Sequence, residues 1–214
     1  MKKLDYKVQE KELYNPQTKP ALINVPQMTF ICIDGRGNPN DQDGEYQKAV
    51  EALYGLTYTI KMSAKSGIVI DDYFDYVVPP LEGLWWIDDC KEFNFRDKAQ
   101  FCWTAMIRQP EFVTEKVFQQ AKATIIKKKP ELDISKLRLA LFIEGLCVQC
   151  MHIGSFDDEP TTITKINEYI EDNNLINDLS DIRRHHEIYL SNPQKAEITK
   201  MKTIIRLPVK NNHI

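Results

Sequence analysis

The sequence predicts an α+β fold built as one domain. Runs rich in β-branched and aromatic residues stop at glycine or proline, which is typical of strands. Three other stretches repeat apolar residues at helical spacing. The segments MTFICIDGRG (28–37) and LCVQCMHIGS (146–155) each enter a turn and then a helix. This order is consistent with an internal duplication, in which residues of about 23–110 and 137–209 form the two repeats.

The first half of the chain begins with a polar segment, residues 1–20, which we interpret as a surface arm leading into the domain at 21–214. A strand over 28–34 should end at the glycines of 35–37. A helix should then start at Asp43 as its N-cap and stop at 66–67. Extended segments follow, which we place at 73–78, 84–87 and 101–107.

The second half begins with a helix capped by Thr114 and ended by the lysine run before Pro130. The long apolar stretch 137–153 is interrupted at Glu144 and Gly145, so it is either two extended pieces or one bent strand. Thr162 is the expected cap of the next helix. The last two strands are expected at 185–190 and 201–209.

Composition excludes several functional classes. The net charge of −3 argues against a protein built chiefly to bind nucleic acid, which normally has a basic surface. Apolar runs fall far short of the about 20 residues that span a bilayer, and the N-terminus lacks the apolar stretch of a signal peptide. Five cysteines, an odd number, fit free thiols in a reducing compartment. We therefore expect a cytoplasmic protein with no membrane partner and no direct contact with nucleic acid.

Three short motifs are better explained by structure than by chemistry. Cys147 and Cys150 form a C-x-x-C, but zinc would need a second ligand pair, so we interpret them as two unrelated buried thiols. The glycines at 35 and 37 lack the rest of a dinucleotide-binding motif. His185 and His186 are adjacent in a strand and face opposite sides, so they should not chelate one ion. We predict no metal and no cofactor.

The segment 185–190 is more informative because alternation separates its two faces. One face carries His186 with apolar residues and should be mostly core. The other carries His185, Glu187 and Tyr189, and it is either a polar solvent-exposed face or the wall of a pocket. An acid and a phenol at this spacing could polarise one ligand.

The tryptophans fall within 19 residues, at Trp85, Trp86 and Trp103. Phe101 stands next to them in the sequence. Such a cluster suits either core packing or a ligand pocket. In a regular strand Trp85 and Trp86 face opposite ways, so only one of them can line a cleft.

Several segments resemble the GyrI-like small-molecule-binding proteins, in the stand-alone branch of about this length. They are IDGRGNPN (33–40), PPLEGLWW (79–86), FCWTAMIRQPEFVT (101–114), EGLCVQCMHIGSFDDEP (144–160) and HHEIYLSNPQKAEITKMKTIIRLPV (185–209). The resemblance implies duplicated strand-helix-strand-strand units that form an antiparallel sheet, with helices on one face and a ligand cleft on the other. It also implies that Glu187, in an E-x-Y pattern with Tyr189, reaches into the cleft.

The chain is similar to the subfamily of cyclopropanoid cyclopropyl hydrolases, which open a strained ring inside an aromatic cage. The resemblance implies that a flat aromatic ligand stacks on Trp103 and on Trp85 or Trp86, beside Phe101. Glu187 would orient or deprotonate the attacking water, and Tyr189 or His185 would hydrogen-bond the ligand oxygen that gains negative charge.

Three functions remain open at this point. The chain is either a hydrolase of DNA-alkylating cyclopropanoids, a non-catalytic protein that sequesters aromatic or cationic drugs, or a module that blocks another protein. Glu144 is a second candidate carboxylate, although a surface acid at the strand break explains it better. Nothing in the sequence indicates the oligomeric state.

Overall fold

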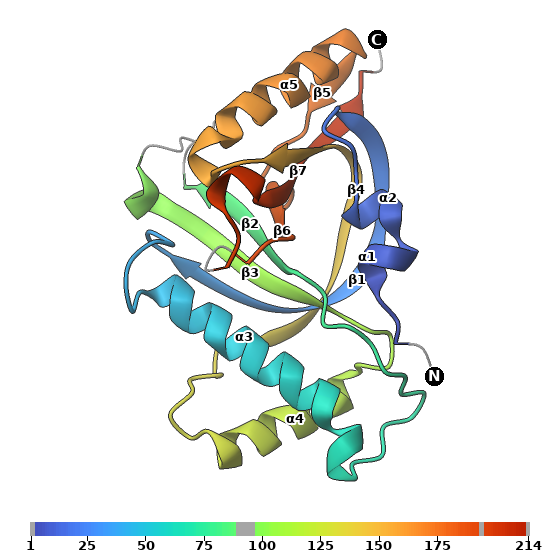
Figure 1. Ribbon diagram of the computed structural model, residues 1–214, viewed down its shortest axis with the longest axis vertical. Helices are drawn as coiled ribbons and strands as arrows, with labels where there is room; N and C mark the ends of the chain where they lie inside the picture. The colour runs from blue at the N-terminus through green and yellow to red at the C-terminus, as the bar shows by residue number, and fades with distance from the viewer. Residues whose placement is uncertain (1–2, 89–96, 193–194, 213–214) are drawn as a thin grey trace.

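The computed structural model describes residues 3–88, 97–192 and 195–212 (Figure 1). The helices are α1 (Tyr6–Gln9), α2 (Lys11–Tyr14), α3 (Glu45–Met62), α4 (Glu115–Lys128) and α5 (Glu159–Asp172). The strands are β1 (Ala21–Arg36), β2 (Leu81–Ile87), β3 (Phe101–Gln109), β4 (Arg138–Ile153), β5 (Leu175–Asn177), β6 (His185–Tyr189) and β7 (Lys202–Asn211). Strand, helix, strand, strand occurs first in β1, α3, β2 and β3, and the second half repeats this order in β4, α5, β6 and β7 with the short strand β5 inserted after α5. That these are duplicated units stays a prediction.

The strands form an antiparallel sheet that closes on itself like a barrel. Its order is β4-β1-β3-β2-β6-β7-β5, and β4 also pairs with β7. Closure depends on the long strands β1 and β4, because β4 pairs with β1 over one stretch and with β7 over Cys147–Ile153. Gly145 lies where β4 bends, with φ of 73°, a conformation that favours glycine. The stretch 137–153 is therefore one bent strand.

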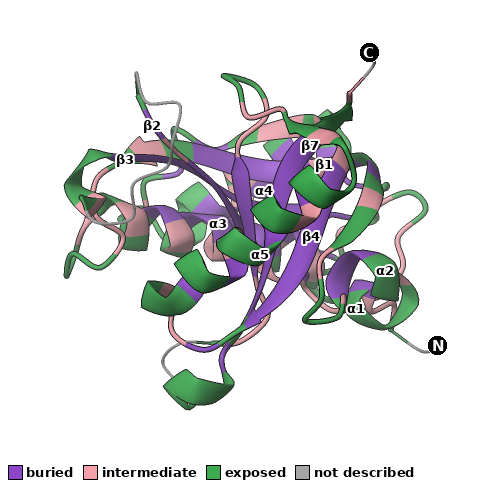
Figure 2. Cartoon of the chain, turned by 90° about the horizontal axis from the view of Figure 1, so that it is seen from above, coloured by how far each residue is buried: buried purple, intermediate pink, exposed green. Residues whose placement is uncertain are grey.

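Helices cover the outside of the barrel in two places. α3 and α4 pack on β1, β2 and β3 at one end of the molecule, in a core that includes Ile31, Leu56 and Ile107. α5 packs on β4 and β7 at the other end, through Ile166 and Ile205. Figure 2 shows buried strands between helices whose outer faces are exposed. The prediction of an α+β protein with an antiparallel sheet is confirmed.

The inside of the barrel is filled by side chains from the opposite face of the same strands. Apolar members include Phe30, Met106 and Ile188. Residues 1–20, predicted as a surface arm, contain α1 and α2, and their Tyr6, Leu13 and Tyr14 belong to this same cluster. The arm therefore contributes to the core instead of lying free.

Three predicted elements or boundaries were wrong. Residues 73–78 form no strand, because within them only Tyr76 makes a bridge, to Leu4. Asp43 does not cap α3; it has a positive φ of 56°, and Gly44 takes the N-cap position. Thr162 lies inside α5, where its hydroxyl contacts His152 Nδ1 at 2.9 Å.

Two helix predictions stand. The Thr114 side chain caps α4 by accepting a hydrogen bond from the backbone N–H of Val117. α4 ends within the lysine run. Among the described residues, no helix combines the length and the apolar character needed to cross a membrane.

Candidate functional site

Glu187 lies at a large cavity between α3 and the start of α5. The cavity measures about 1210 Å³, and its lining includes Glu187, Tyr189, Trp85 and residues of α3. Register places Glu187 opposite Gly83, and Trp85 opposite both His185 and Trp103, so these residues share the outer face of the sheet. The resemblance led us to expect the cleft on the face without helices. That face points into the barrel, which side chains fill. The cavity instead lies on the helix-covered face, in the gap between the two helical layers.

The carboxylate of Glu187 is held by neighbours on its own strand. The Tyr189 hydroxyl donates a 2.7 Å hydrogen bond to Glu187 Oε2, and Trp85 Nε1 donates to the Tyr189 oxygen at 2.8 Å. Position 83 needs a glycine beside these two hydrogen bonds, because a Cβ on Gly83 would lie 2.7 Å from Trp85 Nε1 and 3.1 Å from the Tyr189 oxygen. Burial and the charge of Glu187 raise the pKa of Tyr189 well above its usual value, so the phenol stays protonated and donates.

Glu159 is a second acid at this site, and the sequence analysis missed it. It lies in the first turn of α5, is 2% exposed and lines the cavity beside Glu187. Burial, the charge of Glu187 and a hydrogen bond with Glu187 raise the pKa of Glu159 well above its usual range. Two carboxyls this close resist ionising together, which is why Glu159 keeps its proton. Within the described part of the chain, Glu159 Oε1 has no hydrogen-bond partner.

Aromatic rings form the walls around the carboxyl pair. Trp85 contacts Tyr46 at a centroid distance of 5.3 Å and Phe101 at 5.8 Å. Phe156 meets the ring of Tyr189 edge-on at 5.7 Å. Tyr46 and Phe156 were not singled out from the sequence, and Tyr46 lies among the apolar residues of α3 that pack on the core. A tyrosine on such a stripe is the available signal, because its hydroxyl needs a polar partner where it is buried.

Two of the predicted cage residues do not line the cavity. Trp103 is fully buried beneath Tyr46, with the two rings perpendicular and 5.0 Å apart, so no ligand can stack on it. Trp86 faces the other way from Trp85, as alternation requires. Arg184 lies over its ring at 4.6 Å, and its indole nitrogen donates to Asp88. Trp85 and Phe101 are therefore the predicted rings that border the cavity.

His185 is buried behind Glu187 and does not face the cavity directly. Its Nε2 lies 3.0 Å from Glu187 Oε1. Ligand atoms of Glu159, His185 and Glu187 all lie within 4.8 Å of one another, so in the described chain this group could hold a metal ion. The proton on Glu159 already reduces the charge repulsion between the two carboxyls, which a metal ion would otherwise have to neutralise. Both residues proposed to bind the ligand oxygen, Tyr189 and His185, thus contact Glu187 instead.

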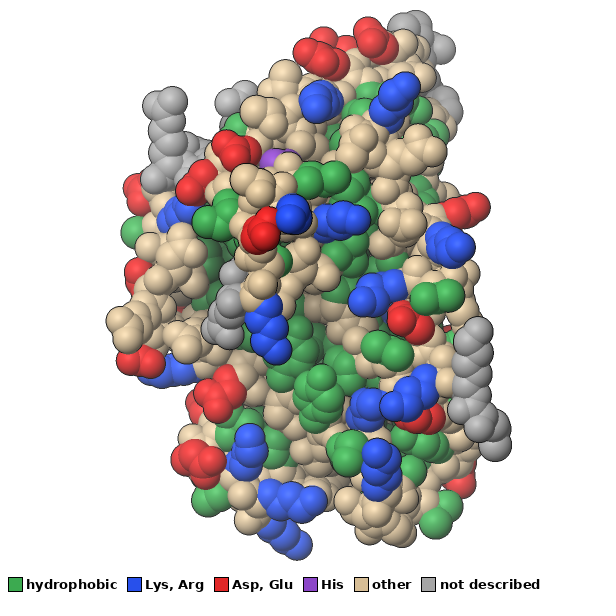
Figure 3. Space-filling view, viewed as in Figure 1, with side chains coloured by type: hydrophobic (Ala, Val, Ile, Leu, Met, Phe, Trp, Pro, Cys, Tyr) green, Lys and Arg blue, Asp and Glu red, His purple; other side chains and the backbone are tan. Residues whose placement is uncertain are grey.

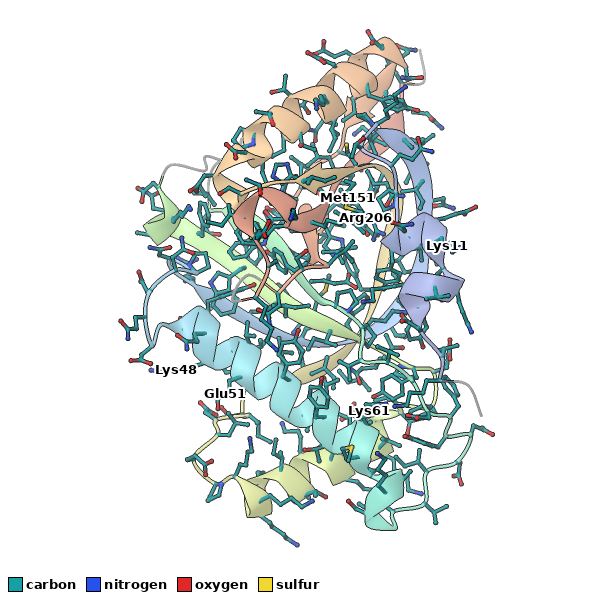
Figure 4. The ribbon with its side chains drawn as sticks, in the orientation of Figure 1. Lys11, Lys48, Glu51, Lys61, Met151 and Arg206 are labelled. Carbon is teal, nitrogen blue, oxygen red and sulfur yellow. The ribbon has the colours of Figure 1, made fainter. Side chains whose placement is uncertain are left out.

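Glu144 and His186 form a separate charged network inside the barrel. The His186 ring lies between two acids, with Nδ1 2.8 Å from Glu144 and Nε2 3.0 Å from Glu82. Arg206 donates to Glu144 Oε2 at 3.1 Å and to the carbonyl of Leu13 at 2.6 Å; Figure 4 labels Arg206 among the strands. Glu144 is 5% exposed. Its interpretation as a surface acid was wrong, because the bend in β4 carries it inward.

The C-x-x-C residues are both buried thiols on β4, and burial raises the pKa of Cys147 and of Cys150. Neither of them lines the cavity. Cys90 lies outside the described residues. The thiols of this motif therefore belong to the interior packing and not to the candidate site.

Comparisons with known proteins agree with this architecture. A family model described as the GyrI-like small molecule binding domain matches residues 18–210. A structure of an uncharacterized conserved protein from Listeria innocua is 48% identical, with a TM-score of 0.92 over 97% of this chain and 100% of that chain. Two structures of a hydrolase from Listeria innocua are also 48% identical, with TM-scores of 0.88 and 0.90; they cover 97% and 98% of this chain and 100% of their own. A search of curated proteins found no match.

Proposed function

Because the chain belongs to the GyrI-like small-molecule-binding family, we propose that its cavity binds a flat aromatic molecule and hydrolyses it. The substrate class is the cyclopropanoid alkylating agents, in which a cyclopropane ring is fused to a dienone. Opening that ring with water removes the electrophile that would otherwise alkylate DNA. The similar Listeria innocua structures described as a hydrolase support an activity of this kind.

The carboxyl pair Glu159–Glu187 is the observation that carries the proposal. Burial and the neighbouring Glu187 raise the pKa of Glu159, so Glu159 stays protonated beside the carboxylate that would act as the base. Glu159 Oε1 is buried without a partner among the described residues, although it is an acceptor at the cavity wall. A water held between the two acids would give one hydrogen to Glu187 and the other to Glu159 Oε1. Its lone pair would then point toward the ligand.

The reaction needs one base and a well-placed ligand. Water attacks the cyclopropane methylene, and a C–O bond forms while a ring C–C bond breaks. The electron pair of that bond moves into the dienone, whose oxygen takes a proton from solvent. Glu187 accepts the proton of the attacking water and later returns it to solvent. Strain in the ring supplies much of the driving force, so general base catalysis of about 10²–10⁴-fold and positioning suffice.

Aromatic walls position the ligand in this scheme. Trp85, Tyr46 and Phe101 offer ring faces and edges beside the carboxyl pair. Tyr189 fixes the Glu187 carboxylate through its hydrogen bond, and the indole of Trp85 fixes Tyr189 in turn. These three side chains therefore couple ligand stacking to the orientation of the base.

Sequestration without chemistry is the second candidate. A charged carboxylate surrounded by rings also suits an aromatic cation, which would pair with Glu187 and stack on Trp85. The two functions differ in what happens to the ligand. A binding protein returns the ligand intact, whereas an enzyme releases a product that contains one more water.

Mass spectrometry of a spirocyclopropyl-dienone alkylator incubated with the protein separates these functions. We expect a product heavier by one water, formed by the wild type and lost in Glu187→Gln. The matched control is Glu168→Gln, an exposed acid on α5, which should keep full activity. A chelator should leave the rate unchanged, and loss of activity in the chelator would replace this mechanism with a metal-dependent one. An intact compound together with a raised melting temperature would overturn the hydrolase proposal in favour of sequestration.

A further inference from the structure

The opening of a cyclopropanoid uses only half of the carboxyl pair Glu159–Glu187. Glu187 takes a proton from the attacking water, whereas the proton of Glu159 has no destination in that scheme. The electron pair of the broken bond moves through the dienone to an oxygen several bonds away from the attacked methylene, and solvent supplies that oxygen with its proton. A substrate whose leaving oxygen is bonded to the attacked carbon itself would use both members of the pair.

Glu159 is placed to give its proton to a ligand. The side chain is 2% exposed and lines the cavity from the first turn of α5. Its Oε1 has no hydrogen-bond partner within the part of the chain that the structure describes. The terminal torsion of a glutamate is broad and nearly two-fold, so half a turn exchanges the two oxygens and brings the O–H to that unpartnered position. The buried acid therefore has a proton to donate and a direction in which to donate it.

Glu187 lies beside Glu159 as the base. Ligand atoms of the two carboxyls lie within 4.8 Å of each other, and the two side chains share a hydrogen bond. The Tyr189 hydroxyl donates to Glu187 Oε2, and His185 Nε2 lies 3.0 Å from Oε1. An acid and a base this close can act on neighbouring atoms of one small ring, because each needs to be within hydrogen-bond reach of the proton it moves.

We propose that the same cavity hydrolyses aryl epoxides to vicinal diols, with Glu159 as the acid and Glu187 as the base. Water attacks one ring carbon, and a new C–O bond forms while the bond from that carbon to the ring oxygen breaks. The ring oxygen takes the proton of Glu159, and Glu187 takes a proton from the water. The inference rests on the proposed function for the base and its water, and it adds the acid.

The hydrogen bond between the two acids restores the pair without solvent. After the ring opens, the transferred proton lies on Glu187, and Glu159 carries the charge. Transfer along their hydrogen bond returns the proton to Glu159, so the pair holds the same number of protons before and after a turnover. Cyclopropanoid opening instead adds a proton to the pair, which solvent must remove. A buried pair is therefore better matched to a substrate that takes up one proton as it releases another.

The walls of the site favour an epoxide that carries an aromatic ring. Trp85 contacts Tyr46 and Phe101 at centroid distances of 5.3 and 5.8 Å, and all three border the cavity. Figure 3 shows hydrophobic side chains gathered in the middle of this face of the molecule, alongside α3. An aryl group packed against these rings fixes the position of the adjacent epoxide carbon. The same aryl group stabilises the positive charge that builds up on that carbon as the ring opens.

Racemic styrene oxide tests the proposal, with the diol measured by mass spectrometry and the remaining epoxide by chiral chromatography. We expect the wild type to form the diol about 100-fold faster than buffer alone and to consume one enantiomer first. Glu187→Gln should lose this activity. Glu168→Gln, which changes an exposed acid on α5, is the matched control and should keep it. An epoxide that stays intact with the wild type would overturn the inference.

Glu159→Gln separates the acid from the base. The amide keeps an acceptor for the water but has no acidic proton, so the rate of epoxide opening divided by that of cyclopropanoid opening should fall about 100-fold. A cooperative melting transition confirms that the variant is folded. A ratio equal to that of the wild type would overturn the role of the acid and with it this inference. If the wild type opens the epoxide and leaves the cyclopropanoid intact, the proposed function fails, and the loss of epoxide opening in Glu159→Gln still decides the inference.

Discussion

The Tyr189 hydroxyl donates a 2.7 Å hydrogen bond to Glu187 Oε2, and both side chains come from the same face of β6. The strand alone determines this pairing, because residues two apart in a strand point the same way. The base of the proposed reaction is thereby oriented by its own strand, and the Trp85 indole orients Tyr189 from the neighbouring strand β2.

Tyr189→Phe should lower kcat more than it changes KM. The substitution keeps the ring but removes the donor to Glu187 and the acceptor for Trp85. A hydrogen bond to a charged group contributes about 1.5–3 kcal/mol, which corresponds to a loss of roughly 10–100-fold in rate. Steady-state kinetics on the alkylator measure both constants. A rise in KM at unchanged kcat would instead make Tyr189 a ligand-binding residue.

Glu159→Gln should stabilise the protein at neutral pH. The folded-state pKa of Glu159 is raised, so the folded chain holds a proton that the unfolded chain releases above about 4.3. Wild-type stability therefore falls as the pH rises toward the folded-state pKa, and this loss is absent in the amide. Melting temperatures from pH 4 to pH 8 should diverge by a few degrees in favour of the variant. Parallel curves for wild type and variant would show that Glu159 is not protonated in the folded state.

Substitutions of Trp85 and Trp86 should have different effects on ligand affinity, although the two residues are adjacent. Trp85→Phe removes a cavity wall and the donor to Tyr189, so ligand affinity should fall about tenfold. Trp86→Phe changes a ring that packs under Arg184, away from the cavity, and should bind the ligand as the wild type does. Titration calorimetry of both variants measures the affinities. Equal losses in the two variants would contradict the assigned face of β2.

The network around His186 predicts a stability maximum at mildly acidic pH. Burial alone would lower the pKa of His186, but the charge of Glu144 and hydrogen bonds to Glu144 and Glu82 raise it to about 9. The contribution of His186 to the free energy of unfolding is therefore complete below about pH 6.5 and is lost as the pH rises through 9. Arg206 also faces this network, because it donates a hydrogen bond to Glu144 Oε2.

The acidic side of that maximum comes from Glu144. Burial opposes its charged form, but His186 and Arg206 lower its pKa to about 2, so its contribution is lost as the pH falls from about 4.5 toward 2. The free energy of unfolding, measured with urea from pH 3 to pH 10, should fall on both the acidic and the alkaline side of the maximum. His186→Gln should abolish the alkaline slope, and an unchanged slope in that variant would assign it to other groups.

Local patterns in the sequence predicted much of the fold and half of the site. Alternation placed Glu187 and Tyr189 on one face, and it separated Trp85 from Trp86. Closure of the barrel was not predictable, because it depends on the bend at Gly145, which brings β4 to β7 far away along the chain. The same bend turns Glu144 inward.

The residues missed at the site come from elements with an ordinary local role. Glu159 looks like an acid that favours a helix N-terminus, and Tyr46 looks like a member of an apolar helix stripe. α3, which packs on β1 and β3, and α5, which packs on β4 and β7, bring both residues to the cavity that Glu187 lines. The spacing of these residues along the chain therefore does not predict that they lie close to Glu187.

A single turnover in heavy-oxygen water tests the central claim most directly, namely that Glu187 activates a water for attack on the cyclopropane ring. The wild-type protein, in excess over a spirocyclopropyl-dienone alkylator, should release a product one water heavier whose new hydroxyl carries the heavy isotope, and Glu187→Gln should release none. An unlabelled hydroxyl would mean that a carboxylate oxygen attacks the ring, and an intact alkylator would mean that the protein only binds it.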